Sequence, residues 1–167
     1  SPWTVLAQGI STRSNLSIGV ATFLISVSIL IFWIPLKQIP GIGTVLNAII
    51  IASAIDLTLP YLPRPDTTFF KILQASFGIL IVGIGSGIYL SSNLGPGPRD
   101  GLMVGLQKKT NTAIPVIRTF IELSAVTLGW FLGGVVGIGT ILFVFGVGPC
   151  VGIGLTLVEK TSKKAVS

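Results

Sequence analysis

The sequence lacks most of the residue types on which enzyme sites depend. Its 167 residues include no histidine and one cysteine, Cys150. Without histidine, the usual ligands of zinc, copper and haem are missing, as are the Ser-His-Asp and Cys-His catalytic arrangements. One cysteine cannot form an internal disulfide. We therefore expect no enzyme activity, no metal site and no cofactor.

Charged residues are also scarce, and this excludes a water-soluble fold. They make up 10% of the chain, against about 25% in a typical soluble domain. Hydrophobic residues make up 50% and the mean hydropathy is +0.90, so the apolar surplus must face the lipid bilayer. The net charge of +6 is then typical of topology signals in cytoplasmic loops, not of a nucleic-acid-binding surface. We expect an all-α fold, a polytopic membrane helix bundle.

Five apolar runs approach the length of a membrane-spanning helix, which is about 20 residues. They are 16–36, 41–60, 69–91 and two runs between 114 and 158 that are separated by the glycine-rich segment 133–139. Prolines close the second run, because they cannot continue a helix. The sequence therefore predicts five spans in this chain.

Two stretches, 1–12 and 93–109, do not fit a simple span. The helical part of the second is too short to cross a bilayer, so we expect a re-entrant or interfacial helix there. The expected organisation is one transmembrane domain over 1–158. A polar, basic and mobile cytoplasmic tail over 159–167 is expected to follow it.

The chain repeats itself at an offset of 96 residues. With Pro2 aligned to Pro98, identical residues recur at Leu6/Leu102, Gly9/Gly105, Asn15/Asn111, Ile18/Ile114 and Gly41–Thr44/Gly137–Thr140. This self-similarity indicates a duplication, with repeat one over 1–67 and repeat two over 68–158. Three spans separate the two motif copies, so the copies should lie on opposite faces of the membrane. That arrangement is an inverted 3+3 repeat.

The repeat and the basic residues together predict a topology. A span precedes the second motif copy, so we expect a matching helix before Ser1 and six spans in the complete protein. One face would hold Lys37, Arg99, Lys108, Lys109, Lys160, Lys163 and Lys164, and the other Arg13, Arg64 and Lys71. The excess of positive charge places the first face, and the C-terminus, in the cytoplasm.

Arg118 and Glu122 are charged residues inside the fourth predicted span. Four residues apart, they share one helix face. A charge at the bilayer centre costs about 2.5–3.5 kcal/mol on insertion scales, so neither side chain should face lipid. Two interpretations stay open: a structural ion pair that fixes this helix in the bundle, or a site for a solute or proton.

Two polar residues lie in the second predicted span. Asp56 is interpreted as a solvated helix end. Asn47 is nine residues away, on the opposite side of the helix, so the two should not share a site.

The segment Gly95-Pro96-Gly97-Pro98 breaks the chain and starts a short helix. Free amides at a helix start favour an anion, and Arg99 adds a cation that can bind a carboxylate or phosphate. The alternative is a rigid interfacial turn in which Arg99 pairs with Asp100. The candidate solute-binding set is therefore Arg99, Asp100, Arg118, Glu122 and Asn47.

Small residues and tryptophans have simpler interpretations. Spacings such as Gly83/Gly87 and Gly129/Gly133 allow helices to pack closely. Trp3, Trp33 and Trp130 are expected to be interfacial anchors rather than ligand-stacking residues.

Four motifs resemble those of the bacterial YczE/YyaS/YitT-like integral membrane proteins. They are residues 95–103, Pro2-Trp3-Thr4-Val5-Leu6, Gly43-Thr44-Val45-Leu46-Asn47-Ala48 and Arg118-Thr119-Phe120-Ile121-Glu122-Leu123. The resemblance covers nearly the whole chain and implies a multi-pass protein of the bacterial inner membrane with one further helix at its start. It departs at Thr4, where the family pattern has an acid.

Two functions are consistent with the sequence. The first is a secondary transporter-like protein for an anionic or zwitterionic small solute. The alternative is a non-catalytic membrane subunit or assembly factor, with other membrane subunits or a second copy of the chain as partners. A polar cavity would favour the first, and a closed, dry bundle the second.

Overall fold

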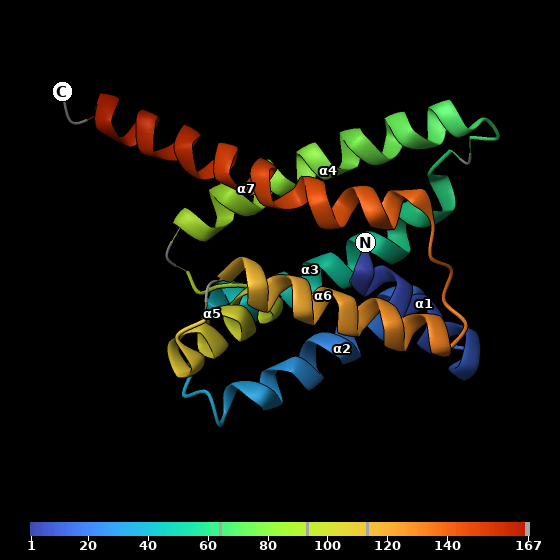
Figure 1. Ribbon diagram of the computed structural model, residues 1–167, viewed down its shortest axis with the longest axis horizontal. Coiled ribbons are helices and arrows are strands. Elements are labelled where there is room, and N and C mark those ends of the chain that lie inside the picture. Colours follow the sequence, from blue (N-terminus) through green and yellow to red (C-terminus); the bar gives the residue numbers. More distant parts are fainter. Residues whose placement is uncertain (64, 93, 113, 166–167) are drawn as a thin grey trace. The chain divides into compact units, whose positions relative to one another are not determined.

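The computed structural model describes residues 1–63, 65–92, 94–112 and 114–165, and their side chains except those of 114–115, 155 and 160–165. Helices make up the secondary structure of this part, as the sequence predicts. They are α1 (Pro2–Ser14), α2 (Ile18–Trp33), α3 (Ile42–Thr58), the short 3-10 helix η1 (Leu59–Tyr61), α4 (Thr68–Ser91), α5 (Pro98–Thr110), α6 (Ile114–Phe131) and α7 (Ile138–Ala165) (Figure 1). Arg64 and the side chains of Lys160, Lys163 and Lys164, which bear on the predicted orientation, lie outside the described part.

The chain forms two compact units. Unit 1 comprises 1–63 and 94–136 and contains α1, α2, α3, α5 and α6, whereas unit 2 comprises 64–93 and 137–167 and contains α4 and α7. A single domain over 1–158 therefore stays a prediction.

Three helices are long and apolar enough to cross a membrane within the described residues. They are Ile42–Tyr61, Thr68–Ser91 and Ile138–Glu159. A fourth span results if α1 and α2, which meet at 113°, form one broken span. The chain therefore has three or four candidate spans by length and composition. The predicted number of five is not confirmed, because α2 alone has only 16 residues and α6 is not among the candidate spans of the described part.

The helix boundaries recur at the offset of the sequence repeat. α1 and α5 begin at Pro2 and Pro98, α2 and α6 at Ile18 and Ile114, and α3 and α7 at Ile42 and Ile138. The first pair of helices also ends alike. Asn15 and Asn111 cap α1 and α5 in the left-handed conformation, with φ of 55° and 53°. Asparagine tolerates this conformation better than most residues, so its recurrence fixes the same stop in both copies.

In unit 2, α4 and α7 lie side by side and run in the same direction (Figure 1). A Cβ at Gly139 would lie 3.4 Å from Ala75, and one at Gly154 would lie 3.0 Å from Gly87, so the contacts advance together along both helices. Val147, Cys150 and Ile79 form the buried core between them. The small residues Gly139, Ala75, Gly154 and Gly87 allow the backbones of α4 and α7 to approach closely.

Helix α7 continues to Ala165. The predicted polar tail therefore begins inside a helix instead of following one. The reason is local: residues 159–165 contain no proline or glycine, so nothing in the segment stops the helix.

The tryptophans correct one expectation. Trp3 and Trp33 are only 9% and 1% exposed and belong to the core of unit 1, so they are not interfacial anchors. The Trp33 indole donates a hydrogen bond to the Pro98 carbonyl at 3.0 Å. It packs against Gly101, where any side chain would overlap the ring. Trp130 is 62% exposed and remains a predicted anchor.

Candidate functional site

The start of α5 is held against the start of α3. Thr44 Oγ1 donates to the Pro96 carbonyl at 2.7 Å, and the Gly43 amide donates to the Leu94 carbonyl at 2.9 Å. Gly95 has a φ of +104°, a conformation that favours glycine, and lets the chain turn between these two bonds. The helix-breaking motif 95–98 is thus a fixed turn that places the first residues of α5 next to α3.

Gly97 brings two of the predicted site residues together. It is the N-cap of α5 and has no side chain to cap the helix. A Cβ built there would lie 3.2 Å from both Asn47 Oδ1 and Asp100 Oδ2, so the space beside Gly97 is bounded by these two polar groups. Asn47 reaches this point from α3. In α1 the equivalent positions are Ser1 and Thr4. Their hydroxyls form a hydrogen bond of 2.7 Å with each other, so no comparable space remains there.

Arg99 stacks on an aromatic ring from the other half of unit 1. Its Cζ atom lies 4.8 Å from the centroid of the Trp3 ring, which is the geometry of a cation–π contact. The sequence interpretation of Trp3 as an anchor missed this role. The repeat alignment carried a signal for it, because Trp3 and Arg99 are equivalent positions 96 residues apart.

Arg118 and Glu122 form the ion pair that their spacing predicts. Arg118 Nε donates to Glu122 Oε1 at 3.1 Å, and the Glu122 side chain is 6% exposed. The Arg118 side chain is 24% exposed, so one end of the pair reaches the surface of the unit. At the equivalent positions in α2 lie Thr22 and Ser26, which are also buried but bond to the backbone of their own helix.

The four charges of α5 and α6 form one electrostatic group. Asp100 interacts with both Arg118 and Arg99, and Glu122 interacts with Arg118 and Asp100. The group comprises two basic and two acidic side chains. The structure therefore brings together Arg99, Asp100, Arg118 and Glu122, with Asn47 beside Asp100.

Three of these side chains have unused hydrogen-bonding capacity. In the described part of the chain, Arg118 and Glu122 form the one ion pair, and the side chains of Arg99, Asp100 and Asn47 take part in no hydrogen bond. The described residues also leave no fully buried polar side-chain atom unpaired. Arg99, Asp100 and Asn47 are half-buried, so their unpaired groups are partly exposed. Together they can offer a solute a guanidinium, a carboxylate and an amide.

Asp56 has a structural role in place of the expected solvated helix end. Its carboxylate accepts hydrogen bonds from the Ser17 hydroxyl and, at 2.7 Å, from the Gly19 amide. These groups lie at the start of α2, where a carboxylate is stabilised by the free amides and the helix dipole. Asp56 thus caps a neighbouring helix and is separate from the Asn47 group.

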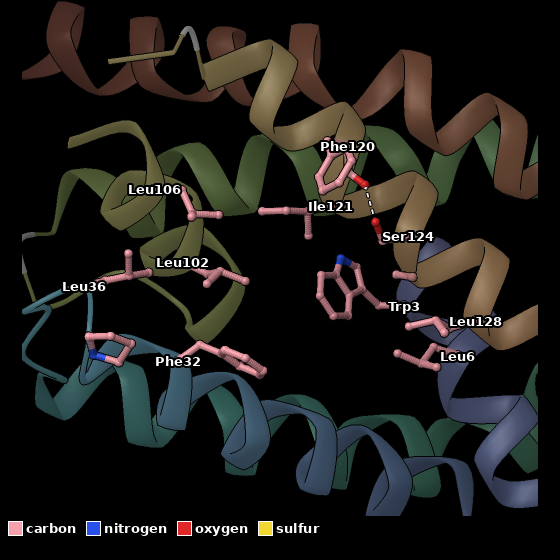
Figure 2. Close-up of a pocket in the computed structure, with 12 residues that line it drawn as sticks. Trp3, Leu6, Phe32, Leu36, Leu102, Leu106, Phe120, Ile121, Ser124 and Leu128 are labelled. Carbon is pink, nitrogen blue, oxygen red and sulfur yellow. Dashed lines mark hydrogen bonds between the residues drawn. The ribbon is translucent and has the colours of Figure 1, made fainter. Parts of the chain in front are cut away.

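A pocket of about 420 Å³ opens between the helices of unit 1. It is lined by Trp3, Leu6, Phe32, Pro35, Leu36, Leu102, Leu106, Phe120, Ile121, Ser124, Ala125 and Leu128 (Figure 2). Sequence reasoning did not locate this pocket. Its lining is apolar, so its residues have no signal that distinguishes them from lipid-facing or core residues.

No group of three or more potential metal ligands comes together in the described residues. Cys150 is a buried free thiol in unit 2.

Comparisons with known proteins identify relatives over nearly the whole chain. The model of a family described as "Family of unknown function (DUF6198)" matches residues 1–155. An uncharacterized protein of Haemophilus influenzae is 43% identical over 96% of this chain and 73% of its own length. No solved structure matches the chain.

Two Bacillus subtilis proteins bear out the family resemblance. The uncharacterized membrane protein YczE is 34% identical over 85% of this chain and 66% of its own length. The uncharacterized protein YyaS is 27% identical over 96% of this chain and 82% of its own length. The description of YczE as a membrane protein agrees with the long apolar helices of this chain.

Proposed function

The chain belongs to the DUF6198 family, a family of unknown function, and from this premise we propose that it is a secondary transporter-like membrane protein for a small anionic or zwitterionic solute. One observation carries the proposal: Asn47 and Asp100 border the same point at the start of a short helix, next to Arg99, and none of the three side chains takes part in a hydrogen bond among the described residues. In transporters, the starts of short or broken helices commonly point at anionic groups of the substrate.

An inverted repeat would place Arg99, Asp100 and Asn47 in the region where transporters bind their substrates. Contacts in unit 1 recur between equivalent residues of the two repeats. Gly9 of α1 packs against Leu132. At the offset of 96 residues, the equivalent pair is Gly105 of α5 and Leu36, and these two residues also pack together. Likewise α1 contacts α2 and α6, and α5 contacts α6 and α2. This reciprocity supports a two-fold relation between the halves. Binding sites of inverted-repeat transporters lie at the repeat interface, next to broken helices.

The direction of α4 and α7 also supports the proposed crossing order. The two helices are the third and fifth spans of the proposed topology, and such spans must run in the same direction. The parallel contacts between them meet that requirement. We further place the protein in the bacterial inner membrane with a cytoplasmic C-terminus, on the distribution of basic residues.

A second function, that of a non-catalytic membrane subunit or assembly factor, is favoured by one observation. The pocket that shares Trp3 with the charged group is apolar rather than polar. A subunit would use this group to fix its own helices, and it would bind no solute.

Binding and transport assays on the purified protein in proteoliposomes test the proposal. A panel of small carboxylates, amino acids and phosphates is screened for thermal stabilisation and for electrogenic or radiotracer uptake. Arg99→Gln and Asp100→Asn should abolish the response, whereas Lys108→Gln should keep it. Lys108 is a matched control, because it is an exposed cation in the same helix.

Two outcomes would contradict the transporter function. One is a wild-type response that Arg99→Gln leaves unchanged. The other is no response to the whole panel together with a stable partner that co-purifies from native membrane, which would favour the subunit function.

A further inference from the structure

The pocket of unit 1 suits a hydrocarbon chain and not a hydrophilic solute. Leu6 and Leu102, which are equivalent residues in the two repeats, both contribute to its lining, as do the equivalent residues Phe32 and Leu128. The Ser124 hydroxyl already donates to the Phe120 carbonyl at 2.8 Å (Figure 2). A site with so few polar partners holds water poorly. An apolar group can therefore enter it without displacing well-bound water.

Trp3 connects this pocket to the charged group. Figure 2 shows its indole ring among the lining side chains, and the same ring carries the Arg99 guanidinium at 4.8 Å. Among the described residues, no carboxylate forms a direct ion pair with Arg99, although Asp100 and Glu122 interact with it electrostatically over longer distances. The Trp3 ring thus contacts both the apolar pocket and the Arg99 guanidinium, whose N–H groups take part in no hydrogen bond among the described residues.

We propose that the solute is a single-chain amphiphilic anion, such as a medium-chain carboxylate. Its charged group would bind Arg99, and its hydrocarbon tail would occupy the pocket. This inference rests on the proposed function and narrows the class of its solute. The pocket volume of about 420 Å³ is within the range of small-molecule sites, about 300–1,000 Å³, and suits one tail better than the two tails of a phospholipid.

The charged group must supply the selectivity. Lipid tails are as apolar as the pocket, so a tail gains little free energy by moving from the bilayer into the protein. A hydrogen bond to a charged group contributes about 1.5–3 kcal/mol, which corresponds to about tenfold or more in affinity. An uncharged amphiphile of the same length should therefore bind about tenfold more weakly.

Photolabelling of the full chain in phosphatidylcholine nanodiscs tests this inference. The probe is a decanoate that carries a diazirine near the end of its tail, and the labelled residues are mapped by mass spectrometry. Unlabelled decanoate, decanol and butyrate serve as competitors. We expect labels on Leu6, Leu102, Leu106 or Phe32, competition by decanoate, and competition about tenfold weaker by decanol.

Two substitutions on one helix provide a matched pair. Leu128 lines the pocket and Leu123 does not, yet both are on α6 and are 57% and 56% exposed. Leu128→Trp should fill part of the pocket and reduce labelling, whereas Leu123→Trp should leave it unchanged. Because both side chains are exposed, neither substitution should prevent folding. Arg99→Gln should reduce labelling as Leu128→Trp does.

The possible results separate this inference from the proposed function. Equal competition by decanol and decanoate would overturn the inference, because the pocket would then bind any hydrocarbon chain without regard to its charged group. Equal effects of Leu128→Trp and Leu123→Trp would overturn it too. If butyrate competes as well as decanoate and its binding depends on Arg99, the charged site stands and the tail pocket does not. If no carboxylate binding depends on Arg99, the proposed role of that residue also fails.

Discussion

Arg99 and Trp3 contact each other, although they are equivalent residues of the two repeats. The Arg99 Cζ atom lies 4.8 Å from the centroid of the Trp3 ring. In a two-fold arrangement, a residue meets its own equivalent only close to the symmetry axis. Where the two copies meet, one copy thus contributes the Arg99 cation and the other the Trp3 ring. Because the two residues differ, they can attract each other through a cation–π contact.

This contact should be measurable as a coupling free energy. We expect a double-mutant cycle of Trp3→Leu and Arg99→Met to give about 0.5–2 kcal/mol, the range for cation–π contacts from exposed to desolvated sites. Thermal or denaturant unfolding in detergent measures it. The same cycle with exposed Trp130→Leu in place of Trp3→Leu is the control and should give no coupling. A coupling near zero for Trp3 would show that the ring and guanidinium are only neighbours.

The Arg118–Glu122 pair should respond differently to single and double substitution. Arg118→Met alone leaves a carboxylate buried without its partner, and this should cost up to about 3–5 kcal/mol of unfolding free energy. Combining it with Glu122→Leu should restore folding. Stability is measured by unfolding, and activity by the solute response. Folding with lost activity indicates a solute or proton site, whereas recovery of both indicates a structural pair.

Gly101 should tolerate no side chain. A Cβ there would overlap the Trp33 ring, whose indole is bonded to the Pro98 carbonyl. Gly101→Ala should destabilise unit 1 by about 1–3 kcal/mol, the usual cost of overpacking. Gly78→Ala is the control, because nothing described lies within 4 Å of a Cβ there, and it should be neutral or stabilising by up to about 1 kcal/mol. Similar unfolding midpoints for the two variants would contradict the packing described for Trp33.

The proposed topology predicts accessibility from opposite faces. In a Cys150→Ser background, Gln38→Cys should react with an impermeant maleimide only in inverted vesicles, and Val135→Cys only in intact spheroplasts. These residues lie in the loops after α2 and α6, the equivalent helices of the two repeats. A reporter fused after Ser167 should be cytoplasmic. Reaction of both cysteines from one face would rule out inversion.

Local features of the sequence predicted much of the fold. Chain breaks at proline and glycine gave several of the helix boundaries, and the spacing of Arg118 and Glu122 gave the ion pair, because these depend on neighbouring residues alone. The cap that Asp56 provides and the stacking of Trp3 on Arg99 depend on which helices become neighbours. Helical periodicity does not contain that information. The apolar pocket was hidden for a related reason, since leucines that line a pocket look like leucines that face lipid.

The division of the chain into two units has a consequence for biosynthesis. Unit 1 needs residues 94–136 as well as 1–63, and α4 must find a partner, α7, from which 46 residues separate it. A ribosome adds about 5–20 residues per second, so α4 would wait seconds in the translocon or the lipid with its glycine face uncovered. A nascent chain halted at residue 92 would contain neither unit, and we expect it to be recognised by membrane quality control rather than to accumulate as a stable fragment.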